Sequence, residues 1–206
     1  MFADLAHSAL ITSECQNGVI GPAAALPQLA EAAASTVIPN GAKLCAAARS
    51  AGVPVLHCTA GRRTDGRGSN TNARLFMAMR KASRPLELGD TPTQVVDEFD
   101  VQPEDFVLSR MHGLSPMAGT DLDPILRNLG VNALVVAGVS VNVAIPNLVM
   151  DAVNHGYRVV VPRDAVAGVP AAYAEQVLDN TLSLIAELVT TEDVIAEWVA
   201  LTANSA

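Results

Sequence analysis

Residues Ala133 to Asn147, ALVVAGVSVNVAIPN, are the stretch that decides the fold of this chain. The apolar run 133–137 predicts a buried strand, Gly138 predicts a turn, and the residues from Ala144 onward are typical of a helix. A strand without polar alternation is buried on both faces, as in parallel sheets that helices cover. We therefore predict an α/β fold with a functional site at the carboxyl end of this strand.

The rest of the chain repeats this alternation of strands and helices. Further strands are predicted at 8–13, 53–58, 106–111, 158–161 and 188–190. Helices are predicted at 26–50, broken at Pro39-Asn40-Gly41, and at 72–81, 121–129, 144–155, 171–188 and 192–201. The pattern indicates a three-layer α/β/α, Rossmann-like fold with a mostly parallel central sheet of about six strands. We interpret residues 1–206 as a single domain.

The composition excludes some classes of partner. The chain has 13 basic and 21 acidic residues, a net charge of −8, which argues against binding to nucleic acid or to an anionic membrane surface. No apolar run reaches membrane-spanning length, and the stretch 1–7 has no signal-peptide pattern, so we expect a cytoplasmic protein. Cys15, Cys45 and Cys58 lack metal-ligand spacing and are expected to be reduced thiols, with Cys15 and Cys45 in the core.

Three residues of interest follow separate predicted strands at the same edge of the sheet: Glu14, Arg110 and Ala144. A carboxylate at the end of a buried strand is partly desolvated, which suits acid–base chemistry. The amide groups at 144 and 145 lie in the first turn of a helix and lack internal partners, so they could bind an oxyanion or a carboxylate.

The segments 9–18, ALITSECQNG, and 138–147, GVSVNVAIPN, together resemble the isochorismatase-like hydrolase superfamily, in a match that spans about 8–192. The resemblance implies a cis peptide at Val139–Ser140 and a catalytic cysteine at the position of Ala144. Glu14 stands where relatives carry a general-base Asp, followed by the matching pair Gln16 and Asn17. Relatives also have a Lys before the segment 115–122, and Arg110 or His112 replaces it here.

These replacements change the expected chemistry. A methyl group cannot attack a carbonyl, so Ala144 rules out a covalent intermediate at that position. Arg110 stays charged and grips carboxylates, whereas Lys can transfer a proton. We expect Glu14 to act as general acid or base, Arg110 to bind substrate or to pair structurally with Glu14, and the amide of Ala144 to stabilise negative charge.

Further substrate contacts are predicted at His112, Val143, Ser140, His57 and Arg62. His57 is placed at the end of the second strand, although a core histidine is an alternative. Arg62 lies in a loop with Arg63 and Arg67, and a solvated loop is the alternative there. Asn70, Asn72 and Asn142 are interpreted as helix caps.

No cofactor or metal ion is expected. Nicotinamidases of this superfamily carry an Asp/His metal cluster after the second strand, and the stretch 59–65 contains no His. The resemblance therefore implies a metal-independent, cysteine-free hydrolase that acts on a small anionic enol ether, amide or lactone. Isochorismatases proper also work without the cysteine. The alternatives are a ligand-binding pseudoenzyme and a cysteine hydrolase that uses Cys15 or Cys58. We expect a homo-oligomer, a dimer or larger.

Overall fold

A parallel sheet forms the centre of the molecule. The computed structural model describes residues 5–22, 24–82 and 85–204; residues 1–4, part of the stretch searched for a signal peptide, lie outside it. In the described part, seven strands form one sheet in the order β3-β2-β1-β4-β5-β7, with β6 paired to β4, and every pair is parallel. The strands are β1 (Ser8–Ser13), β2 (Val55–Ala60), β3 (Phe106–Arg110), β4 (Ala133–Val139), β5 (Arg158–Pro162), β6 (Val166–Ala167) and β7 (Glu187–Val189).

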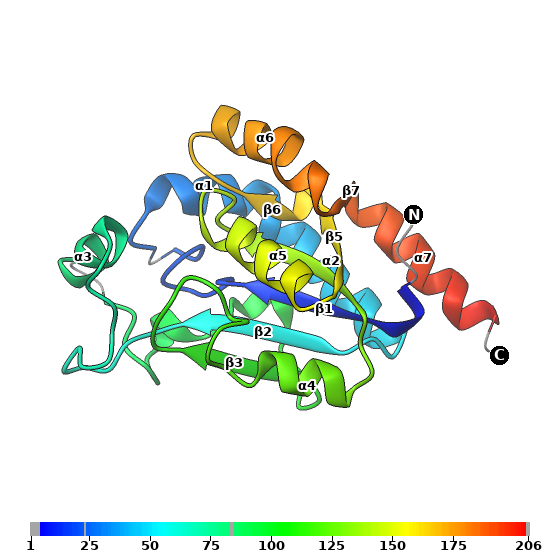
Figure 1. Cartoon of the computed structure of the whole chain (residues 1–206), viewed down its shortest axis with the longest axis horizontal. Coiled ribbons are helices and arrows are strands. Elements are labelled where there is room, and N and C mark those ends of the chain that lie inside the picture. Colours follow the sequence, from blue (N-terminus) through cyan, green and yellow to red (C-terminus); the bar gives the residue numbers. More distant parts are fainter. Residues whose placement is uncertain (1–4, 23, 83–84, 205–206) are drawn as a thin grey trace.

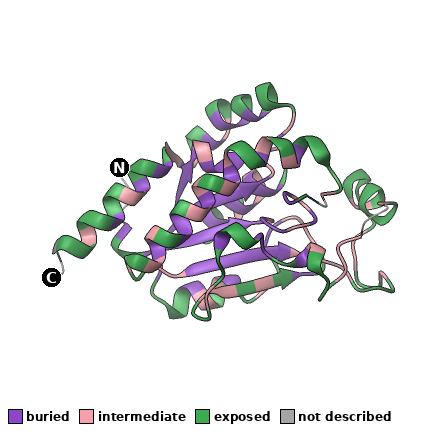
Figure 2. Cartoon of the chain, turned by 180° about the vertical axis from the view of Figure 1, so that it is seen from behind, coloured by how far each residue is buried: buried purple, intermediate pink, exposed green. Residues whose placement is uncertain are grey.

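Helices cover both faces of this sheet, so the predicted three-layer architecture is confirmed (Figures 1 and 2). One face carries α1 (Pro27–Ser35), α2 (Val37–Ser50) and α7 (Thr191–Asn204), and the other carries α4 (Leu122–Asn128), α5 (Ala144–Asn154) and α6 (Ala171–Asn180). A further helix, α3 (Arg74–Arg80), stands apart from both layers. The 3-10 helices are η1 (Leu5–His7), η2 (Thr91–Thr93), η3 (Asp97–Phe99), η4 (Arg163–Ala165) and η5 (Leu182–Leu184). Among the described residues, no helix combines the length and apolar character needed to cross a membrane.

The strands at the centre of the sheet are buried along their whole length. Every residue of β1 and β4 is buried, as expected for strands with helices above and below them. The edge strand β3 instead alternates between half-buried and exposed positions, and only its last residue, Arg110, is buried. The apolar run that predicted β4 therefore also predicts its central place in the sheet.

The two helices of the 26–50 segment separate at a different point from the predicted one. α1 ends at Ser35 and α2 begins at Val37, so the chain turns at Thr36. Pro39 lies in the first turn of α2, where a missing N–H removes no hydrogen bond. Gly41 serves packing instead, because a Cβ atom there would lie 2.4 Å from the ring of Phe99.

Other boundaries also differ from the prediction. The predicted helix at 171–188 ends at Asn180, and η5 follows it before β7. β2 begins and ends two residues later than the predicted strand at 53–58. β6 was not predicted, since two residues are too few to show a hydrophobic period.

Candidate active site

A buried ion pair links two of the predicted site residues at the carboxyl edge of the sheet. Glu14 follows β1 and Arg110 ends β3, with β2 between the two strands. The Arg110 side chain spans β2, and its Nη2 donates a hydrogen bond to Oε1 of Glu14. The side chains of Arg110 and Glu14 are 5% and 21% exposed, so the carboxylate is the more accessible partner. Of the two alternatives stated for Arg110, the structure shows the pairing with Glu14.

The backbone of Glu14 is held in an unusual conformation. Its φ of 54° lies in the left-handed region, which residues with side chains rarely adopt. The Glu14 N–H donates to the carbonyl of Cys58 at 2.8 Å, which extends the ladder between β1 and β2. The buried Gln16 side chain then accepts from the Ala60 N–H at 2.7 Å and donates to the Ala60 carbonyl at 2.8 Å. Gln16 thus holds the turn that presents Glu14.

Arg110 carries more donors than its neighbours satisfy. Its Nε and Nη1 are buried and, in the described part of the chain, have no hydrogen-bond partner. Ser13 Oγ, at the end of β1, is in the same situation. Ser13 pairs with Cys58 and Arg110 with Ala60, and these two positions of β2 lie on one face of the sheet. An unpaired buried donor costs about 1–3 kcal/mol, which acceptor atoms of a ligand or water would offset.

The turn between β4 and α5 is built on a glycine and a cis peptide. Gly138 has a φ of 116°, and a Cβ atom there would lie 2.2 Å from the carbonyl oxygen of Ser13. Only glycine therefore fits where β1 and β4 approach each other. The Val139–Ser140 peptide is cis, as the resemblance predicts.

Within the residues that the structure describes, the first amide of α5 lacks a hydrogen-bond partner, whereas its neighbours on both sides are engaged. The carbonyl of Ser140 accepts hydrogen bonds from the N–H groups of Val143 and Ile145, at 3.2 and 3.0 Å. The prediction that the amide at 145 is free is therefore wrong, and the amide of Val143 is engaged as well. The N–H of Ala144, the first residue of α5, has no partner among the described residues. The start of α5 thus carries a single N–H donor without a partner in the described part of the chain.

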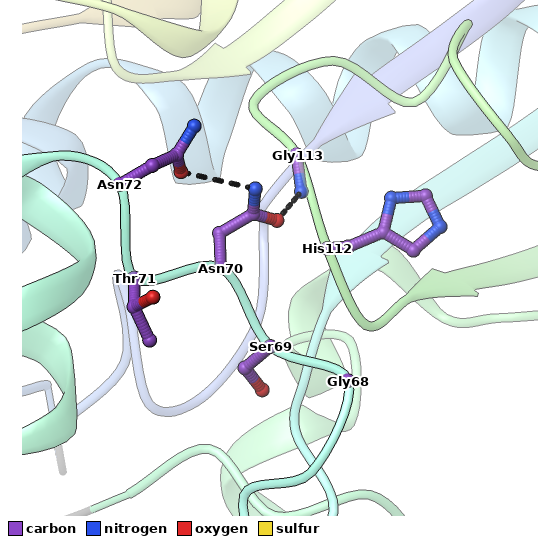
Figure 3. Close-up of a pocket in the computed structure, with 7 residues that line it drawn as sticks. All are labelled: Gly68, Ser69, Asn70, Thr71, Asn72, His112 and Gly113. Carbon is purple, nitrogen blue, oxygen red and sulfur yellow. Dashed lines mark hydrogen bonds between the residues drawn. The ribbon is translucent and has the colours of Figure 1, made fainter.

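His112 and the loop after β2 form an open cavity next to this edge. The cavity measures about 490 Å³ and is lined by Gly68, Ser69, Asn70, Thr71, Asn72, His112 and Gly113 (Figure 3). His112 is exposed, and its ring points away from Asn70. The Asn70 side chain accepts from the Gly113 N–H at 2.8 Å and donates to Oδ1 of Asn72 at 3.2 Å. Asn70 therefore joins the loop after β2 to the loop that follows Arg110.

The three asparagines interpreted as caps have other roles. The helix α3 has no side-chain cap, because Asn70 and Asn72 bond within the cavity wall instead. Asn142 likewise does not cap α5. Its side chain bonds the N–H of Val169 at 2.9 Å and the Val169 carbonyl at 2.6 Å. A polar residue close to a helix start is a weak signal when a nearby loop offers better-placed partners.

His57 lies away from the edge, inside the sheet. It is the third residue of β2, fully buried, with Nδ1 2.8 Å from Thr12 Oγ1 and Nε2 3.4 Å from Asp105 Oδ2. Burial lowers the pKa of His57 below its usual value, although Asp105 acts in the opposite direction. The prediction of a substrate contact at His57 is thus not supported, and the core-histidine alternative describes it.

Arg62 lies beside the site with its charge already partnered. Its Nη2 is 3.6 Å from Oε1 of Glu87, and its N–H and carbonyl bond the backbone of Leu86 and Leu88. Arg63 is paired with Asp65 through two hydrogen bonds. The loop therefore brings less unpaired positive charge to the site than its sequence suggests.

This arrangement matches a known family. The protein-family model "Isochorismatase domain" matches residues 8–193, nearly the whole chain. The chain belongs to the isochorismatase family. The fold agrees with this membership: a cysteine hydrolase from Pseudomonas syringae pv. phaseolicola superposes with a TM-score of 0.82 at 25% identity, covering 94% of this chain and 93% of that one. An isochorismatase family protein from Desulfovibrio vulgaris gives 0.78 at 26% identity, covering 92% and 98%.

Two named amide hydrolases of the family are similar in sequence. Ureidoacrylate amidohydrolase RutB from Pseudomonas syringae pv. syringae is 33% identical over 153 residues, which cover 68% of this chain and 61% of that protein. N-carbamoylsarcosine amidase from an Arthrobacter species is 28% identical over 133 residues, 64% of this chain and 49% of the relative. The matches thus span about half to three-fifths of the length of these relatives.

The three thiols of the chain are unsuited to act as nucleophiles. Cys15 and Cys58 are 2% and 1% exposed, and Cys45 is fully buried, as predicted for Cys15 and Cys45. Burial raises the pKa of Cys58 to about 12 and raises that of Cys15 well above its usual value. All three thiols are therefore protonated at neutral pH and out of reach of substrate. The described residues also contain no cluster of three or more His, Cys, Asp or Glu side chains able to hold a metal ion.

Proposed function

We propose that the protein hydrolyses a small, anionic amide without a covalent intermediate, with Glu14 as general base and then general acid. The observation that carries the proposal is the Glu14–Arg110 pair, in which an accessible carboxylate lies against a buried guanidinium that has two unused donors. Membership in a family of hydrolases and the named amide substrates of the two relatives support the choice of bond.

The first step is the addition of water to the substrate carbonyl. Glu14 takes one proton from the water as its oxygen bonds to the carbonyl carbon, and the carbonyl oxygen becomes an oxyanion. The N–H of Ala144 is oriented by the start of α5 to donate to that oxygen. The unused donors of Arg110 suit a carboxylate of the substrate.

The second step is the loss of the amine. Arg110 cannot give up a proton at neutral pH, so Glu14 returns the proton that it took to the leaving nitrogen. The C–N bond breaks, the carbonyl reforms, and the carboxylate of Glu14 is regenerated. In this scheme one carboxylate does work that members with Asp, Lys and Cys divide among three side chains, and no metal ion is required.

A panel of small amides, N-carbamoyl acids, lactones and enol ethers, followed by mass spectrometry, tests this proposal. Glu14→Gln should lower kcat/KM by at least about a hundredfold, because it removes the base and keeps the shape. Glu175→Gln is the matched control, since Glu175 also pairs with an arginine but lies on exposed α6. Thermal unfolding of both variants shows that they are folded. Full turnover in Glu14→Gln would exclude the mechanism.

The second candidate is a binding protein on the same scaffold, which the methyl group at Ala144 favours. It predicts that no member of the panel is turned over while an anionic amide raises the melting temperature. Arg110→Met should abolish that stabilisation. This outcome would replace the hydrolase proposal with a ligand-binding function.

A further inference from the structure

The helix α3 lacks the packing that the other helices have. It projects beyond the carboxyl edge of the sheet, and none of its seven residues is buried by the described part of the chain (Figures 1 and 2). Its centre is the apolar run Leu75-Phe-Met-Ala-Met79, in which Leu75, Met77 and Met79 are 41%, 43% and 44% exposed. An isolated helix of this length is marginal in water, and one that is apolar on all sides needs a partner surface.

The same segment separates the charge of the chain into two regions. Residues 62–81, which we call the arm, contain six basic residues and one acidic residue, a net charge of +5. The rest of the chain therefore has a net charge of −13, and together with the +5 of the arm this gives the total of −8. Arg74, Arg80 and Lys81 have no acidic partner among the described residues, whereas Arg62 and Arg63 are paired.

An acidic and apolar surface of matching character lies along the segment 97–107. Its acidic residues Asp97, Glu98, Asp100 and Glu104 are exposed. Val101 and Val107, 41% and 51% exposed, lie in the same segment. Val107 belongs to β3, whose outer edge pairs with no strand in the described part of the chain. Negative charges beside exposed valines complement positive charges beside exposed leucine and methionines.

We propose that the arm docks on segment 97–107 of a second copy of this chain. The arm follows the carboxyl end of β2, while segment 97–107 leads into the amino end of β3. A two-fold axis beside β3, with the two β3 strands antiparallel, brings each arm to the segment of the other copy. The contact is then the same on both sides, and the dimer is closed. It covers α3 and the unpaired edge of β3 together.

Sedimentation velocity of the full chain tests this proposal through a charge exchange. The wild type should be a dimer at low salt, and its dissociation constant should rise with salt concentration. The arm variant R74E/R80E/K81E and the body variant D97K/D100K/E104K should each weaken self-association at least about tenfold. An equimolar mixture of the two variants should form a heterodimer, because both of its contacts then join opposite charges, and the six substitutions combined in one chain should likewise restore the dimer.

Two controls separate this contact from general effects. The exchange R163E/E175K reverses an ion pair between Arg163 of η4 and Glu175 of α6 and should leave the dimer unchanged. Leu184→Asp changes the most exposed large apolar residue of the described part of the chain, 80% exposed, and should also have no effect. A wild type that stays monomeric at every concentration, a dimer that tolerates the arm variant, or a combined variant that stays monomeric would each overturn the proposal.

Discussion

Two polar networks lie near β1, one reaching Thr12 within the strand and the other Glu14 just after it, and only one of them has the properties of a site. The inner network joins Thr12, His57, Asp105 and Arg49, and the edge network joins Glu14 and Arg110. Both contain a carboxylate against an arginine. They differ in whether solvent reaches them and in whether the arginine keeps buried nitrogens without a partner in the described part of the chain.

The inner network is almost sealed from solvent, and of its buried polar atoms only Nε2 of His57, 3.4 Å from Asp105 Oδ2, makes no hydrogen bond to a described residue. Arg49 donates twice to Asp105, at 3.2 and 2.7 Å, and the Gln102 N–H donates to it at 2.9 Å. Burial alone would raise the pKa of Asp105, but these hydrogen bonds outweigh burial and hold it below its usual value. Thr12, His57 and Asp105 stand in the order of a hydrolytic triad, yet Thr12 is 1% exposed and no substrate can reach it. The network therefore stabilises the fold.

The edge network is incomplete without a ligand. Arg110 keeps two nitrogens without a partner among the described residues, and the carboxylate of Glu14 remains partly exposed. Reactive residue types alone thus do not identify a site in this fold. The edge network is identified as a candidate site because arginine nitrogens without a partner lie next to an accessible carboxylate. This difference between the two networks can be measured.

The largest expected effect is a loss of stability when the arginine of the inner network is removed, compared with removal of the arginine of the edge network. Arg49→Met leaves Asp105 buried without its cation and should lower the free energy of unfolding by about 3 kcal/mol. Arg110→Met leaves only the partly exposed Glu14 unpaired and should change it by less than about 1 kcal/mol. Urea denaturation of both variants measures this difference. Equal losses would show that the edge pair is as structural as the inner one.

The sequence predicts the edge network better than the inner one, because the residues that follow a strand can be located from the end of its apolar run. The apolar strands and their order along the chain place Glu14, Arg110 and Ala144 at one edge, because parallel strands end together. His57 was misplaced because the second strand was predicted two residues too early. That shift moves a residue from the end of a strand to its interior.

Contacts between distant segments are the part that the sequence does not reveal. Asp105 and Arg49 are 56 residues apart, and neither belongs to a motif. The role of Gln16 is visible only from its bonds to Ala60, on another strand. The helix α3 was predicted from its composition, but only the structure shows that the chain leaves it uncovered.

The inner network should also make stability depend on pH. The folded protein binds a proton at His57 more weakly than the unfolded chain, whose pKa is near 6.5. The free energy of unfolding should therefore be level above about pH 6.5 and fall below it, by up to about 1.4 kcal/mol per pH unit. His57→Asn should remove this slope between pH 6.5 and 5. A slope that survives in this variant would assign the effect to another group.

A smaller effect is expected at the cavity wall. Asn70→Ala removes the acceptor of the Gly113 N–H and should lower the free energy of unfolding by about 1 kcal/mol. Because Asn70 positions the loop after Arg110, KM should rise for any substrate found while kcat changes little. Asn180→Ala removes one exposed side-chain bond on α6 and is the control for stability. An unchanged KM would separate the cavity from the site.

Cysteine reactivity can also be compared between the core and the carboxyl edge of the sheet, if a thiol is introduced at the edge. No change in stability is expected from this substitution. The native thiols are buried, and the pKa of Cys58 is raised to about 12, so iodoacetamide at pH 8 should leave the folded protein unlabelled. Ala144→Cys places a thiol at the start of α5, where an amide without a partner among the described residues favours the thiolate. Mass spectrometry should then show one added label at residue 144, formed at least about ten times faster than any label on the native thiols. Equal rates at the two kinds of position would mean that the edge does not stabilise negative charge. In that case the amide of Ala144 could not hold the oxyanion that the proposed hydrolysis requires.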